Sequence, residues 1–216
     1  MASKNINSKE GFTIIEVVLV LAIAGLIFLM VFIALPALQR SQRDTARRND
    51  MSRVDTSLVQ YQTNNSTRNN NLPNPAAGGS FWKGTDDFND DNACPTSGKS
   101  AIACMFVRDY MNSGAAENNK VNEFQDPNGV PYSMFITENW AEKGSISTTA
   151  TENSKLVRGD VANSWTIGGE SPFSEYVVYV VPGARCDGSN VVKSEKRHFA
   201  VLYRLEGAGN YCIDDQ

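Results

Sequence analysis

One carboxylate stands alone in a long apolar run near the start of this chain, and it is the residue there most able to do chemistry. Between Phe12 and Leu38 there are 27 residues, and Glu16 is the only charged one. A charge at mid-depth in a membrane helix costs about 2.5–3.5 kcal/mol, and less near the end of the span. Glu16 therefore either reaches interfacial headgroups or awaits a positively charged partner, and the chemistry alone leaves both interpretations open.

Four cysteines form the second set of reactive side chains, and all lie in the polar part of the chain. They are Cys94, Cys104, Cys186 and Cys212. An even number in an exported domain predicts two disulfides, for which three connectivities exist. We expect pairing between nearest neighbours, Cys94–Cys104 and Cys186–Cys212, with free buried thiols as the alternative. Zinc binding is disfavoured, because there is no Cys-x-x-Cys pair and His198 is the only histidine.

No catalytic motif emerges from the remaining residues. The sequence has no P-loop, no Gly-x-Ser-x-Gly, no His-Glu-x-x-His and no dinucleotide-binding glycine pattern, and His198 lies in a strand-like run. The stretch Asp86–Asn92 alternates like a calcium-binding loop, but Asn92 and Gly98 stand where that loop needs Gly and Glu. We expect an acidic surface loop there, with cation binding left open, and we expect no enzyme activity, no cofactor and no metal site.

The apolar run is long enough to cross a membrane. From Val17 to Leu38 there are 22 uncharged residues, which extend about 33 Å as a helix against a hydrocarbon core of about 30 Å. The preceding Met1–Gly11 is polar and has no apolar core of its own, unlike an ordinary signal peptide. The sequence predicts one membrane-spanning helix followed by a polar body, in a chain of net charge −4.

The residues around Glu16 follow a specific order. A polar, lysine-containing leader ends in Gly11, then Phe12-Thr13-Ile14-Ile15 precede Glu16 and a long aliphatic run. Over roughly residues 4–38 this resembles the processing and assembly motif of type IV prepilins and pseudopilins. The resemblance implies cleavage between Gly11 and Phe12, N-methylation of Phe12, and pairing of Glu16 with the N-terminal amine of a neighbouring subunit. In a low-dielectric bundle only a paired carboxylate is tolerable, so the pair would also fix the axial register of the subunits.

By the same resemblance, the chain is expected to be a structural subunit of a type IV pilus-like filament serving adhesion, twitching motility or DNA uptake. The implied partners are other pilin subunits (as a homopolymer or with minor pilins), a prepilin peptidase, a membrane assembly platform, the lipid bilayer before assembly and an unidentified surface ligand. The subunit would be a single-pass protein of the cell membrane with a cytoplasmic N-terminus before assembly, and part of an extracellular pilus afterwards. A pseudopilin of a type II secretion system and a non-polymerising membrane-anchored surface binding protein stay open as alternatives.

Two features depart from the family pattern. The helix-breaking proline is expected about ten residues after Phe12, but the segment has only Pro36, so we expect a kink or melted turn near Phe32–Pro36. Basic residues also flank the far end of the span, namely Arg40, Arg43, Arg47 and Arg48. The positive-inside rule alone would keep the polar body in the cytoplasm. The resemblance places it outside, the cysteines agree, and we follow the resemblance.

The chain is expected to divide into five segments. They are a leader (1–11), a transmembrane and assembly helix (12–38), an amphipathic continuation (39–64), a connecting region (65–125) and an antiparallel β-sheet head with a C-terminal disulfide region (126–216). Met51, Val54, Leu58 and Tyr61 recur at helical spacing, which predicts one continuous helix from about Thr13 to Gln62. The arginines on its other faces either are solvated or contact acidic groups of adjacent subunits or lipid headgroups.

The polar body is expected to be rich in strands. The pattern predicts a short helix near Ala101–Met111 and strands at about Tyr132–Thr137, Glu175–Val181, Arg197–Leu205 and Asn210–Asp214, with a weaker strand within Lys155–Ile167. The turn-rich Asp126–Tyr132, similar to a turn of many pilins, opens the first strand. The predicted fold class is α+β: a long N-terminal helix, apolar and transmembrane in its first half and amphipathic in its second, packed on a C-terminal antiparallel sheet.

Overall fold

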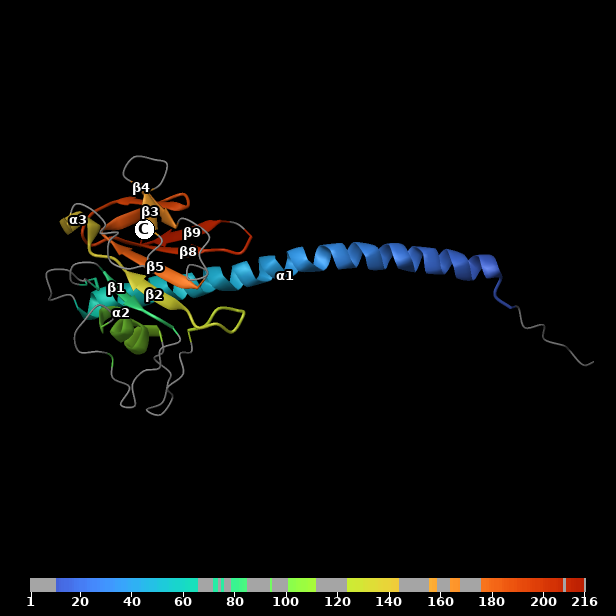
Figure 1. Cartoon of the computed structure of the whole chain (residues 1–216), viewed down its shortest axis with the longest axis horizontal. Coiled ribbons are helices and arrows are strands. Elements are labelled where there is room, and N and C mark those ends of the chain that lie inside the picture. The colour runs from blue at the N-terminus through green and yellow to red at the C-terminus, as the bar shows by residue number, and fades with distance from the viewer. Residues whose placement is uncertain are drawn as a thin grey trace, which may run out of the picture. The chain divides into compact units, whose positions relative to one another are not determined.

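The computed structural model describes residues 11–65, 72–73, 75, 79–84, 94, 101–111, 124–143, 156–158, 164–167, 176–207 and 209–215. The described chain falls into two compact units, one ending at Gln42 and the other beginning at Arg43. Figure 1 labels most of the elements, which are numbered in chain order. Most of the predicted leader and the predicted acidic loop Asp86–Asn92 lie outside the described residues.

Helix α1 (Ile14–Asn64) is continuous over 51 residues, and its bounds agree with the predicted helix to within two residues at each end. Its apolar first part belongs to the first unit, and its amphipathic part from Arg43 onward belongs to the second. In the second unit Met51, Val54 and Leu58 have no exposed surface, so the predicted apolar face is the face that packs on the head.

Two sheets build the head. The first has the strand order β1-β2-β5-β8-β9, with bounds β1 (Ser80–Trp82), β2 (Ser133–Ile136), β5 (Val177–Pro182), β8 (Phe199–Arg204) and β9 (Asn210–Asp214). The second has the order β3-β4-β7-β6, with bounds β3 (Leu156–Arg158), β4 (Ser164–Ile167), β6 (Ala184–Asp187) and β7 (Asn190–Lys193). Strands β2 and β5 run parallel, and every other pairing is antiparallel.

This topology corrects the predicted sheet in two respects. The sheet is not wholly antiparallel, because the long connection from Ile136 to Val177 returns the chain in the same direction, as a crossover between parallel strands requires. Strand β1 falls in the predicted connecting region, and the β6–β7 hairpin has no counterpart in the prediction. The predicted short helix is present as α2 (Ala101–Phe106) followed by the π-helix η1 (Val107–Met111), and one further turn, α3 (Trp140–Lys143), follows β2.

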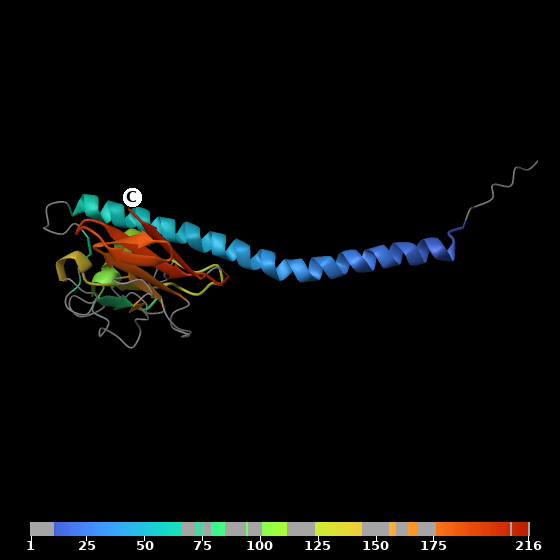
Figure 2. The same cartoon turned by 90° about the horizontal axis from the view of Figure 1, so that it is seen from above.

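The five-stranded sheet has a core on each face. On one face, side chains such as Met134, Val178 and Val201 pack with α1 and α2 in the larger cluster. On the other face, Tyr179 and Leu202 pack against the β6–β7 hairpin and Trp140. Figure 2 shows the last turns of α1 running alongside the sheet. The fold is therefore α+β, a long N-terminal helix with a C-terminal sheet rich in antiparallel pairs, which is consistent with the pilin-like fold.

Candidate assembly site

The apolar half of α1 has no cover within its own unit. Its side chains from Phe12 to Leu38 are exposed apart from Ala24, and Phe12 is 90% exposed. The most apolar window of 18 residues has a mean hydropathy of 3.2 and none of it is buried. Among the described residues α1 is the one helix long and apolar enough to cross a membrane, and this is compatible with single-pass anchoring.

Glu16 is held by Thr13, the residue just before the helix. The backbone N–H and the hydroxyl of Thr13 both donate to Glu16 Oε2 at 2.8 Å, and the Glu16 N–H points back to Thr13 Oγ1 at 3.4 Å. This reciprocal arrangement is a capping box, which satisfies backbone donors that the first helical turn leaves without partners. Both bonds to the carboxylate use one oxygen, so the charge keeps a second oxygen for another donor.

The predicted processing residues lie just before the helix. Gly11 and Phe12 are non-helical and exposed, and among the described residues no atom beyond the immediate chain neighbours lies within 4 Å of a Cβ added at Gly11. Such a segment is sterically open to a peptidase. The chain stays helical from Phe32 through Pro36, so the melted turn is not observed, and a bend of the axis at Pro36 stays a prediction.

A buried set of charges joins α1 to the head, and we call it the Arg47 junction: Asp44, Arg47, Asp126 and Glu206. Arg47 is only 4% exposed. Its Nε and Nη2 groups donate to Asp126 Oδ2 and Oδ1 at 2.6 and 3.2 Å. Its Nη1 group donates to Asp44 Oδ1 at 3.1 Å and to Glu206 Oε2 at 3.3 Å. For Arg47 the two predicted environments, solvent or another molecule, are both wrong, because its partners lie in its own chain.

Local turns place the acidic partners. Asp126 shapes its own turn, because its backbone carbonyl accepts the Gly129 N–H at 2.7 Å and its Oδ1 accepts the Asn128 N–H at 2.9 Å. The hydroxyl of Tyr203 on β8 donates to Asp126 Oδ2 at 3.3 Å. On the other side, Glu206 lies in the turn that joins β8 to β9. The predicted turn at Asp126–Tyr132 is thus present, and it serves to present a carboxylate to α1.

Asp44 makes the second attachment of the junction. Its two carboxylate oxygens accept the N–H groups of Glu206 and Gly207 at 2.9 and 3.0 Å. At the rim, Arg43 donates to both oxygens of Glu206 at 2.8 and 2.6 Å, and this hydrogen bonding lowers the pKa of Glu206. Burial lowers the pKa of Arg47, but the hydrogen bonds and charge of Asp126 more than offset this and leave it raised. Both shifts favour the charged forms of Arg47 and Glu206.

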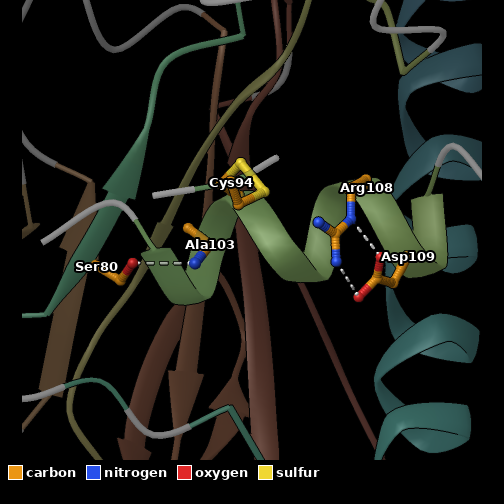
Figure 3. The surroundings of a disulfide bond; sticks show 6 residues. Ser80, Cys94, Ala103, Arg108 and Asp109 are labelled. Carbon is orange, nitrogen blue, oxygen red and sulfur yellow. Dashed lines mark hydrogen bonds and ion pairs between the residues drawn. A yellow bond between two sulfur atoms is a disulfide. The ribbon is translucent and has the colours of Figure 1, made fainter. Parts of the chain in front are cut away.

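Both predicted disulfide pairs are present. Cys94 bonds to Cys104 and Cys186 bonds to Cys212. Figure 3 shows the first pair beside α2, where the N–H of Ala103 donates to Ser80 Oγ at 3.0 Å and ties the helix to β1. The second pair joins β6 and β9, which are edge strands of the two different sheets. The first disulfide thus attaches Cys94 to α2, and the second joins the two sheets.

One carboxylate of α1 is enclosed without a matching donor. Asp55 Oδ1 is buried and accepts no hydrogen bond from the described residues. Burial, together with the negative charges of Asp215 and Asp214, raises the pKa of Asp55 to about 6. Asp215 Oδ1 lies 3.2 Å from His198 Nδ1, so the only histidine meets a carboxylate at the end of the chain. The raised pKa of Asp55 makes its contribution to the stability of the head depend on pH.

The described residues contain no group of three or more His, Cys, Asp or Glu side chains placed to hold a metal ion. A polar cavity of about 450 Å³ opens beside the Arg47 junction and is lined in part by Asn128, Tyr176 and Arg204. Trp82 and Trp140 belong to the core of the head, since they are 3% and 4% exposed.

Two features of the structure were not predicted from the sequence. The capping box has a local signal, the Thr-x-x-Glu spacing of Thr13 and Glu16, and sequence reasoning could have found it. The burial of Arg47 has no local sequence signal, because its partners Asp126 and Glu206 are 79 and 159 residues away in the sequence.

Comparison with known proteins does not assign the chain to a family. No known protein family, curated protein or solved structure matches this chain.

Proposed function

We propose that this chain is a structural subunit of a type IV pilus-like filament. It is inserted in a membrane through α1, cleaved after Gly11, and polymerised through its N-terminal helix. The main observation behind the proposal is the apolar half of α1. Its side chains are exposed along almost the whole segment, and it has one carboxylate close to its start. A surface of this kind needs an apolar environment, and lipid before assembly and neighbouring helices after assembly both provide one.

The position of Glu16 supports assembly over simple anchoring. An anchor needs no charge within the apolar segment, and removing one would make insertion more favourable. Thr13 occupies Glu16 Oε2, and the ammonium group that cleavage creates on Phe12 of a neighbouring subunit would bind the other oxygen. Such a pair forms at a single axial offset, so it selects one register among many that apolar packing alone would allow.

The remaining parts of the proposal follow from this role. Before assembly the subunit is a single-pass protein of the cell membrane, with its N-terminus in the cytoplasm and its head outside. After assembly it forms part of an extracellular pilus, which serves adhesion, twitching motility or DNA uptake. Its partners are other pilin subunits, the prepilin peptidase, the assembly platform and the bilayer. The proposed role is structural, with no enzymatic activity and no cofactor.

The test compares two single acid-to-alanine variants of the full chain, in cells that supply a prepilin peptidase and an assembly platform. Glu16→Ala should leave cleaved subunits in the membrane and abolish filaments in the sheared surface fraction. Glu195→Ala removes an exposed acid from the head and should leave filaments unchanged. Mass spectrometry should find Phe12 as a methylated N-terminus. Filaments from Glu16→Ala at the normal yield, or an unmodified chain that keeps Met1–Gly11 and stays dispersed in the membrane, would refute the proposal.

A further inference from the structure

We propose that the Arg47 junction fixes the rotation of the head about α1, and that Arg47 is the positioning residue through which every subunit presents its head at the same angle. The consequence for filament order rests on the proposed function. The claim about head orientation concerns only the unit that begins at Arg43, and it can be tested without a filament.

Apolar packing on α1 does not by itself determine such an angle. Met51, Val54 and Leu58 bury their side chains in the larger core cluster, and this burial holds helix and sheet together. Hydrophobic burial is non-directional, however, and scales with the area removed from water. Several small rotations of a helix about its axis can bury similar areas when the facing side chains change rotamer. A single orientation therefore needs contacts that depend on direction.

Arg47 supplies such contacts on one side of the head. Its Nε and Nη2 groups form two side-by-side hydrogen bonds with the carboxylate of Asp126, at 2.6 and 3.2 Å. A guanidinium and a carboxylate that meet in this way share one plane, which gives the pair geometric specificity as well as energy. Asp126 is itself fixed, because it closes its own turn and accepts the hydroxyl of Tyr203. Rotation of α1 would break a bond at each of these positions.

Asp44 supplies the second point of attachment. Its carboxylate accepts two backbone N–H groups of the β8–β9 turn, from Glu206 and Gly207. The Asp126 turn leads into β2, and in the sheet β5 lies between β2 and β8. One turn of α1 is therefore attached to two places separated across the sheet. Two separated attachments restrict rotation of the helix more than either one alone would.

The energy of buried ion pairs indicates that these charges orient the head rather than stabilise it. Removing charged groups from water is costly, and replacing a buried ion pair by apolar side chains is often neutral or stabilising. Met51, Val54 and Leu58 already provide burial on the same helix. The ionic junction adds something that apolar residues would not provide, namely a single orientation of the head about α1. In a helical polymer each head repeats its contacts with neighbours, so a spread of orientations would reduce the order of the whole filament.

The test uses the double variant Arg47→Met/Asp126→Asn in the full chain. It removes the ion pair without changing the net charge, and the asparagine keeps an acceptor for the Asn128 N–H. The matched control is Arg108→Met/Asp109→Asn, which removes an exposed pair within η1 that also has two hydrogen bonds. Both residues of the control pair lie in η1, next to each other in the sequence. Both proteins should keep the two disulfides and unfold within about 4 °C of the unmodified chain.

The first measurement is the distribution of distances between two spin labels in detergent-solubilised protein. One label replaces exposed Val59 on α1 and the other replaces exposed Arg185 on β6, by chemistry that leaves the cysteines paired. The unmodified chain and the control should give one narrow distribution, and the Arg47 variant should give a broader one or several populations. An unchanged width in a folded variant overturns the inference.

The second measurement is the helical rise and twist of sheared filaments by electron microscopy. The control should give one symmetry, and the Arg47 variant should lose it while Glu16 and the cleavage site remain intact. Filaments of the variant with unchanged symmetry overturn the inference and leave the proposed function standing. If the unmodified chain forms no filament, the proposed function fails, and the distance distributions still decide the inference. Should the double variant not fold, Arg47→Lys keeps the charge without the two side-by-side bonds and is expected to broaden the distances in the same way.

Discussion

Replacing Asp55 by asparagine should stabilise the head at neutral pH. In the unmodified chain Oδ1 of Asp55 is buried and has no donor among the described residues, and Asp214 and Asp215 add negative charge. The ionised form is therefore the unfavourable one. Asparagine has nearly the same shape as a protonated aspartate, so Asp55→Asn removes the charge while keeping the packing.

The magnitude follows from the pKa of Asp55, which rises from 3.8 to about 6 in the folded state. A folded pKa above the unfolded one means that the contribution of Asp55 to folding stability is greatest in acid and falls as the pH rises from about 4 through 6. The full shift corresponds to about 3 kcal/mol. Because the side chain keeps some contact with water, we expect Asp55→Asn to raise the free energy of unfolding by about 1–2 kcal/mol at pH 7.

The assay is urea unfolding of the full chain in non-ionic detergent at pH 4, 5, 6 and 7. Tryptophan fluorescence reports on the head, because all three tryptophans follow residue 80 in the sequence. The difference between Asp55→Asn and the unmodified chain should be near zero at pH 4 and grow through pH 6. Asp187→Asn, at an exposed position on β6, is the control. A difference that is constant with pH, or a loss of stability in Asp55→Asn at pH 7, would show that the charge of Asp55 is not the cause.

Three further predictions concern the packing of the head, and all are measured by the same unfolding assay. Leu58→Ala should cost about 2–5 kcal/mol because the side chain has no exposed surface, whereas Val59→Ala on the exposed side of α1 should change stability by less than about 0.5 kcal/mol. Gly183→Ala should cost about 2 kcal/mol or more, since φ is +76° and the new Cβ would lie 2.5 Å from neighbouring atoms. Gly188→Ala, with a positive φ but open space, should cost less, and equal losses would contradict the steric explanation. Replacing both cysteines of the Cys186–Cys212 disulfide by serine should cost about 3.5 kcal/mol in the chain-entropy model, and an unfolding midpoint that does not respond to this change would mean that the bond constrains little of the unfolded chain.

Short-range patterns account for what could be predicted about the long helix and its site. A continuous apolar run leads into Met51, Val54 and Leu58, which recur at helical spacing, so the helix and its buried face follow from the sequence. Glu16 is identifiable because any charge in such a run is exceptional. The capping box has a local spacing as well, although only the hydrogen bonds to Thr13 drew attention to it.

The topology of the sheets depends on contacts that short-range patterns do not encode. Strand β1 has only three residues and lies in a region with weak strand character, and its place beside β2 comes from pairing with a segment more than fifty residues away. The parallel pairing of β2 with β5 depends on the path of the whole intervening chain. The strong strands β5 and β8 were predictable because continuous β-branched and aromatic runs mark strands buried on both faces.

The sequence by itself determined the apolar helix, the isolated carboxylate near its start, the turn at Asp126 and the cysteines that form the two disulfides. Each of these features depends on residue types and on short spacings along the chain, which are enough to predict it. Only the tertiary structure decided that Arg47 is buried, that Asp126 and Glu206 are its partners, and that Asp55 has a raised pKa. The physical reason is that desolvation and ion pairing depend on which distant segments surround a charge, and folding alone brings those segments together.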